Sequence, residues 1–125
     1  MSPPTLEELL ESGRLDEPLP DEIEAIIANS VRRGDAPRFL RRLVNYLVLM
    51  GGSARIHQDR LLLLAGTTHL RQLRRFKRAG IDAGLFLASE DAVRMARSTS
   101  YELTDRVLEA CGLGDRLTAA NRAGL

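Results

Sequence analysis

Four arginines lie at helical spacing between residues 69 and 79, a segment that contains no acidic residue. At about 100° per residue, their side chains fall within one arc of about 100° on a helix. The arc consists of Arg71, Arg74, Arg75 and Arg78. A guanidinium group donates hydrogen bonds in a planar fork that fits a phosphate or the edge of a guanine. Because like charges at this spacing repel each other, the pattern favours an anionic partner, for which DNA has the right chemistry.

A second interpretation of this arc is a solvated helix face whose charge is neutralised by acidic residues near the N-terminus. Leu70, Leu73 and Phe76 occupy the opposite side of the helix, which predicts that this side is buried. The chain has no Trp, three Phe and two Tyr, too few for the platforms on which single-stranded nucleic acids stack their bases. Double-stranded DNA is therefore the expected ligand, and duplex RNA recognised by its shape is a variant of the same hypothesis.

The formal net charge of +1 conceals an uneven distribution of charge along the chain. Residues 1–24 hold eight acidic residues and one basic residue, whereas residues 25–81 hold twelve basic and two acidic residues. Such asymmetry favours an anionic partner for the basic middle of the chain. We expect residues 1–24 either to shield the basic surface or to contact a protein partner.

The residue types that most often catalyse reactions form no catalytic pattern here. His57 and His69 are the two histidines, and no further ligand pair at helical spacing accompanies them, so we expect no metal site. Cys111 has no basic neighbour in the sequence and is expected to be a small buried apolar residue. Ser53, in the sequence GGSAR, lacks the strand–turn–helix context of a nucleophile elbow. We therefore expect neither an enzyme nor a cofactor.

Length and composition are those of one globular domain of 125 residues, with 44% hydrophobic and 28% charged residues. The single cysteine excludes a disulfide framework. Apolar runs are too short for a membrane span, and the acidic start MSPPTLEELLESG does not have the pattern of a secretory signal. The expectation is a cytoplasmic protein with no membrane association.

The helical periodicity of most segments predicts a mainly α fold: six to seven helices in one domain, a central helix-turn-helix and at most a short strand pair. We expect an acidic N-terminal segment over 1–18, a helical domain over 19–116 and a frayed tail over 117–125. Three packed helices between residues 37 and 79 are expected to share a core made of Leu40, Leu43, Leu47, Leu61, Leu64, Leu70 and Leu73.

Start and stop signals place further elements along the second half of the chain. Gly80 is expected to end the arginine-bearing helix, and residues 83–88 are compatible with a brief strand. Ser89, followed by two acidic residues, predicts the start of a helix. The sequence TSYE at 99–102 has capping-box spacing and predicts a helix that continues to Cys111.

Residues 37 to about 87 resemble the winged-helix branch of the helix-turn-helix DNA-binding superfamily. An apolar helix ending in glycines precedes the short extended piece SARI, and the segments HQDRLLLLA, GTT and HLRQLRRFKRA then supply a helix, a turn and a second helix before Gly80 and Ile81. In that family the helix after the turn enters the major groove, and a glycine–aliphatic pair leads into a wing. Residues 85–87 are the one candidate wing strand, and the sequence shows no clear partner strand for it.

The resemblance implies DNA contacts for particular residues of the turn and of the helix that follows it. The residues that would face DNA are Thr67, Thr68, His69, Arg71, Gln72 and Arg75, and those nearer the backbone are Arg74 and Arg78. The sequence thus predicts a small DNA-binding protein, a transcription regulator or accessory factor. We expect a dimer that uses apolar residues of its C-terminal helices, namely Val93, Met95, Val107, Leu108 and Leu113. The alternative is an all-α protein–protein interaction module, such as an adaptor, inhibitor or assembly subunit, with no nucleic-acid role.

Overall fold

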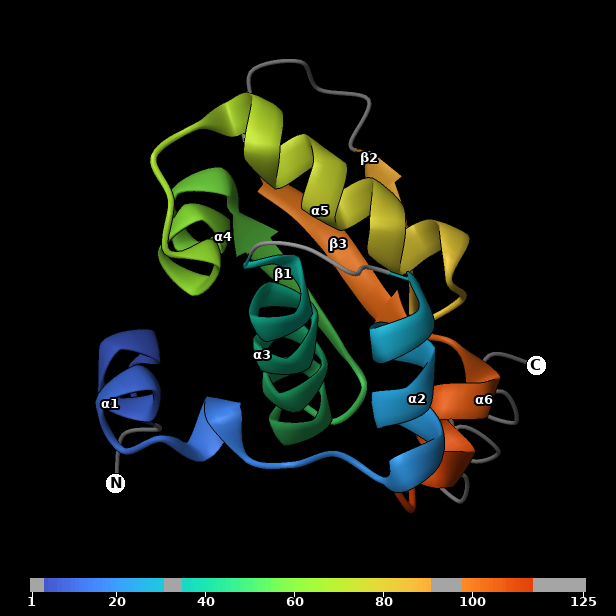
Figure 1. Ribbon diagram of the computed structural model, residues 1–125. Helices are drawn as coiled ribbons and strands as arrows, with labels where there is room; N and C mark the ends of the chain where they lie inside the picture. The colour runs from blue at the N-terminus through green and yellow to red at the C-terminus, as the bar shows by residue number, and fades with distance from the viewer. Residues whose placement is uncertain (1–3, 31–34, 91–97, 114–125) are drawn as a thin grey trace, which may run out of the picture.

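A computed structural model describes residues 4–30, 35–90 and 98–113 of the chain. Within these ranges, six α-helices and three strands pack around one core (Figure 1). In chain order the elements are α1 (Leu6–Glu11), the 3₁₀ turn η1 (Arg14–Asp16), α2 (Asp21–Ser30), α3 (Ala36–Leu49), β1 (Ser53–His57), α4 (Gln58–Ala65), α5 (Leu70–Asp82), β2 (Phe86–Glu90), β3 (Ser98–Leu103) and α6 (Asp105–Ala110). The predicted mainly α fold is confirmed, but the predicted limit of one short strand pair is wrong.

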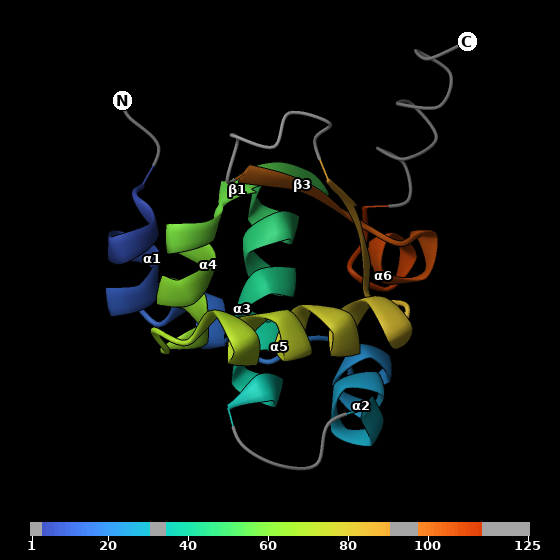
Figure 2. The same cartoon turned by 90° about the horizontal axis from the view of Figure 1, so that it is seen from above.

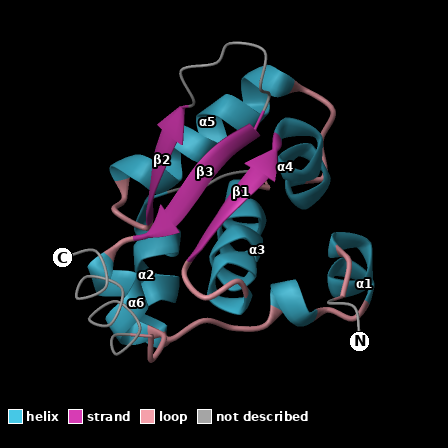
Figure 3. Cartoon of the chain, turned by 180° about the vertical axis from the view of Figure 1, so that it is seen from behind, coloured by secondary structure: helices cyan, strands magenta, loops and turns pink. Residues whose placement is uncertain are grey.

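The three strands form an antiparallel sheet in the order β1-β3-β2, so the last strand lies between the other two. Its register places Tyr101 of β3 between Ala54 of β1 and Ala88 of β2. The helices lie on one side of the sheet, and none of the described helices covers the other side (Figures 2 and 3). This arrangement explains why Tyr101 is buried whereas its neighbour Glu102 is exposed.

Strand β3 corrects the helix predicted to begin at residues 99–102. Tyr101 and Leu103 are buried and alternate with the exposed Glu102, which is the period of two that a half-buried strand requires. The capping-box spacing was misleading, because α6 begins only after Thr104, its N-cap residue. Ser89 likewise belongs to β2, where its backbone is paired in register with Ser100, and does not start a helix.

Helix α3 lies at the centre of the core. Five of its side chains are fully buried, and these are Phe39, Leu40, Leu43, Val44 and Leu47. Leu43 of α3 and Leu73 of α5 are 0% and 2% exposed, which confirms that α3, α4 and α5 pack together around a shared core. Leu70, the first residue of α5, was also predicted to be buried but is 40% exposed.

Residues 4–24 form a segment that packs on the polar side of α3. Arg42 bonds both carboxylate oxygens of Asp16, at 2.8 and 3.3 Å, and also donates to the carbonyl of Leu64 at the end of α4. Arg41 makes two hydrogen bonds of 2.7 Å to Glu24. The apolar residues of this segment enter the same core as α3, and they include Leu6, Leu9, Leu15 and Leu19. The segment therefore contributes both apolar and charged contacts to the packing of α3.

Gly80 lies inside α5 and does not end it, because the helix continues to Asp82. The glycine is buried against the ring of Phe86 in β2, and a Cβ atom at this position would also come within 2.8 Å of the Leu40 side chain. The missing side chain thus lets α5, β2 and α3 approach one another closely. Packing and not helix termination explains a glycine at this position.

We expect Gly80→Ala to lower the free energy of unfolding by up to about 3 kcal/mol. The clash with Phe86 costs about 1–3 kcal/mol, and the better helix propensity of alanine recovers at most about 1 kcal/mol of it. Urea denaturation followed by circular dichroism measures the change. In a Phe86→Leu background the same substitution should cost less, and an equal cost in both backgrounds would contradict the steric explanation.

We also expect stability to fall in acid. The hydrogen bonds from Arg42 and Arg41 hold the pKa values of Asp16 and Glu24 below their ordinary values. The unfolded chain therefore binds protons at a higher pH than the folded chain does, and the stability that these carboxylates contribute is present above about pH 4–5 and is lost as pH falls through their lowered pKa values.

Urea denaturation between neutral pH and about pH 2 tests this expectation. The Asp16→Asn, Glu24→Gln double variant should be less stable at neutral pH and should lose less stability in acid than the parent. Glu11→Gln removes an exposed acid for which the described residues provide no ion pair, and it serves as the control. If the double variant lost as much stability in acid as the parent, the explanation would be wrong.

Candidate nucleic-acid interface

Helix α5 is held in place by its apolar side. Leu73 and Phe76 are buried, and the rings of Phe76 and Phe39 of α3 lie 5.8 Å apart between centroids. Lys77, the one lysine of the sequence, lies beside the sheet, with its ammonium group 5.5 Å from the centre of the Tyr101 ring. The helix lies on the side of the sheet that the described helices cover (Figure 2). These contacts fix which side of α5 faces outward.

The outward side of α5 carries the four predicted arginines, and all four line one hollow of about 820 Å³. Each of them is exposed: Arg71, Arg74, Arg75 and Arg78. The hollow is completed by Ala79, Asp82 and Ala83 at the end of α5 and by Ser30 at the end of α2. The arc predicted from spacing is therefore one wall of a groove whose other wall is the end of α2, an element that the sequence did not connect with it.

Asp82 changes the expected charge of this helix. Because α5 extends three residues beyond 79, it includes an acid, and the Asp82 carboxylate lies 3.7 Å from Nε of Arg78. Both side chains are highly exposed, 67% and 80%, so this pair contributes little stability. The expectation of a helix without an acid is therefore wrong at its C-terminal end. Within the described part of the chain, Arg71, Arg74 and Arg75 form no ion pair.

Acidic residues before position 25 neutralise other arginines. In the described ranges, the ion pairs of this segment join Glu7 to Arg60 of α4, Asp16 to Arg42 and Glu24 to Arg41 of α3, and Glu22 to Arg106 of α6. None of these pairs involves α5. The direct contact by which the acidic segment would shield the arginine arc is thus absent among these residues, and the arc remains open to solvent.

The turn before α5 is held by its own side chains. The hydroxyl of Thr67 donates to Oε1 of Gln72 at 3.0 Å and accepts a hydrogen bond from the backbone N–H of His69 at 3.2 Å. Thr67, Thr68 and His69 line a second hollow, of about 610 Å³, that does not include the arginines. The structure thus brings the four arginines together but ties Thr67 and Gln72 to each other, which gives these two a part in shaping the turn.

The apolar C-terminal residues expected to form a dimer surface belong to the core of this chain. Val107 and Leu108 are 0% and 6% exposed, and Leu108 lies beside Gly52 in the connection between α3 and β1. They are therefore not available to a second copy, and the expectation is wrong for them. Leu113 is half-buried, and Val93 and Met95 lie outside the described residues.

Two residues of types that often catalyse reactions, His57 and Cys111, lie in surroundings that favour a structural role. The Nδ1 atom of His57 accepts a hydrogen bond from the backbone N–H of Asp59 and so caps α4. Cys111 is half-buried, and its burial raises the pKa of the thiol, which disfavours a reactive thiolate.

Within the described ranges, no three His, Cys, Asp or Glu side chains are grouped closely enough to hold a metal ion. None of the helices there has the length and apolar character needed to cross a bilayer.

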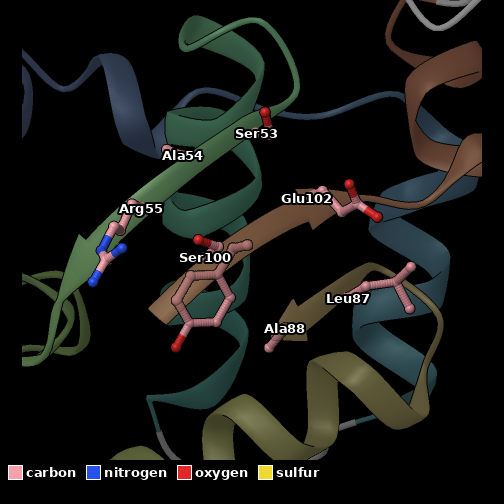
Figure 4. Close-up of a pocket in the computed structure, with 8 residues that line it drawn as sticks. Ser53, Ala54, Arg55, Leu87, Ala88, Ser100 and Glu102 are labelled. Atoms are coloured by element: carbon pink, nitrogen blue, oxygen red, sulfur yellow. The ribbon is translucent and has the colours of Figure 1, made fainter. Parts of the chain in front are cut away.

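The uncovered face of the sheet has a hollow of its own, of about 530 Å³ (Figure 4). Arg55 of β1 and Glu102 of β3 contribute opposite charges to its lining, and Leu87 of β2 lies on this face and is 53% exposed. Sequence reasoning did not find this surface, because its residues come together only through the pairing of three strands.

Comparisons with models of protein families, with curated proteins and with solved structures found no match to this chain.

Proposed function

We propose that this chain is a DNA-binding protein of the winged-helix type that presents α5 to double-stranded DNA. The observation that carries the proposal is the row of four exposed arginines on one side of a firmly packed helix. Arg71, Arg74 and Arg75 form no ion pair with the described acids, although the acidic segment pairs with arginines of three other helices. Phosphate oxygens and base edges would supply the missing acceptors.

The order of elements supports the same class. Helix α3, strand β1, helices α4 and α5 and strands β2 and β3 follow one another in the order that the sequence resemblance implies. The wing of that family needs a strand to pair with the one that follows the arginine-bearing helix, and β3 pairs with β2 in antiparallel register. The resemblance alone provided no such partner strand, so β3 adds an independent argument for the class.

Roles follow from the positions of the arginines along α5. Arg71 and Arg75 lie one turn apart in the first half of the helix, and we assign them to base edges in the major groove. Arg74 and Arg78 are assigned to phosphates, where a guanidinium group neutralises charge without reading sequence. A protein of this kind would act as a transcription regulator or as an accessory factor that binds DNA.

The test replaces Arg71, Arg74, Arg75 and Arg78 with alanine and measures binding to a random-sequence duplex by fluorescence anisotropy at several salt concentrations. We expect the parent to show a steep salt dependence and the variant to lose about one unit of the slope of log K against log salt for each phosphate contact removed. The matched control replaces four exposed arginines that lie off α5, namely Arg14, Arg38, Arg60 and Arg106. Circular dichroism checks that both variants are folded.

The control variant removes the same charge and should retain more binding than the α5 variant. If the parent bound no duplex at low salt, or if the α5 variant bound as well as the parent, the proposal would be wrong. The remaining interpretation would then be a helical protein–protein interaction module that uses the arginine face to dock an acidic partner.

A further inference from the structure

The arginine groove offers hydrogen-bond donors almost exclusively. Guanidinium groups have no acceptor atom, and Asp82, the one acceptor side chain that α5 adds to the groove, lies at its C-terminal end beside Arg78. The Ser30 hydroxyl, on the opposite wall, donates to the carbonyl of Ile27 in its own helix. A ligand that fits this groove must therefore present acceptors along the first turns of α5.

The four bases differ in what they present in the major groove. Guanine has two adjacent acceptors, N7 and O6, whereas adenine pairs an acceptor with a donor and cytosine presents a donor. Thymine presents one acceptor next to a methyl group. A guanidinium group, which only donates, can therefore bond both major-groove atoms of guanine. It can bond at most one such atom of any other base.

The side chain of α5 that could read adenine is occupied elsewhere. Recognition of adenine requires an amide that accepts from N6 and donates to N7. Gln72 is half-buried, does not line the groove, and already uses its Oε1 acceptor for the Thr67 hydroxyl. Ala79 and Ala83 line the groove and could touch a thymine methyl, but both are half-buried near the C-terminal end of the helix.

We infer that α5 reads guanine, with Arg71 and Arg75 each donating two hydrogen bonds to N7 and O6 of one guanine. This inference rests on the proposed function, since it assumes that α5 enters the major groove. Four residues advance about 6 Å along a helix, which corresponds to about two base steps of 3.4 Å. The preferred duplex therefore carries two guanines within about two base steps of each other.

The experiment compares three duplexes of equal length by fluorescence anisotropy with the full chain. The first repeats guanine at every second base of one strand, the second replaces each guanine with 7-deazaguanine, and the third contains only A·T pairs. The 7-deaza analogue keeps base pairing but lacks the N7 acceptor. We expect the parent to bind the guanine duplex about tenfold or more tightly than either of the others, as a bidentate contact would provide.

Conservative variants locate the contact. Arg71→Lys and Arg75→Lys keep the positive charge but lose the planar fork, so each should reduce the preference for guanine over 7-deazaguanine while leaving the salt slope unchanged. Arg74→Lys, the matched control on the same helix, should leave the preference intact. A reduced preference in Arg74→Lys with full preference in the other two would overturn the assignment.

The two proposals fail in different ways. Equal binding of all three duplexes with a steep salt slope would overturn the guanine inference and leave the DNA-binding function in place. An absence of binding to every duplex at low salt would overturn both.

Discussion

Burial of the apolar side of α3 is the constraint on which the other elements depend. Its apolar residues fill the centre of the core, and Phe39 meets Phe76 of α5, so the arginine-bearing helix takes its orientation from α3. The polar side of α3 is covered as well, because Arg41 and Arg42 bind carboxylates of the N-terminal segment. A helix buried in this way needs partners for its charged side chains, and the acidic segment supplies them.

This pairing distinguishes arginines that bind carboxylates of residues 4–24 from the arginines of α5, a difference that net charge alone does not show. Arg42 is largely buried, bonds both oxygens of Asp16 and reaches the carbonyl of Leu64, so it joins the N-terminal segment to the end of α4. Charge-assisted bonds with two partners of this kind are stronger than an exposed pair such as Arg78 and Asp82. Arg42 thus contributes to the packing of the fold, whereas the arginines of α5 remain exposed.

The helices and the arginine arc could be predicted from the sequence because both depend on local periodicity. Leu43 and Leu73 are buried as their spacing required. Strand β3 could not be predicted in the same way, since its residues match a helix start locally and become a strand only between β1, more than 40 residues earlier, and β2. The position of Ser30 beside the arginines depends on tertiary packing as well, so the sequence did not predict it. The sequence predicted a helix stop at Gly80 because the contact of this glycine with Phe86 forms only when the sheet is in place.

The contacts between α5 and the sheet also determine which parts of the helix would lose conformational entropy if a ligand bound. Gly80 lies against Phe86, and the rings of Phe86 and Tyr101 are roughly perpendicular, with their centroids 5.8 Å apart. Lys77 lies over the Tyr101 ring, so the helix is tied to the sheet at several points. A backbone held in this way is already ordered before a ligand arrives and need not lose conformational entropy on binding. The exposed arginines keep their rotamer freedom, about 2 kcal/mol for each side chain. Binding by α5 is therefore favourable only where each guanidinium group gains enough hydrogen bonds to offset its own ordering, which favours bidentate contacts over single ones.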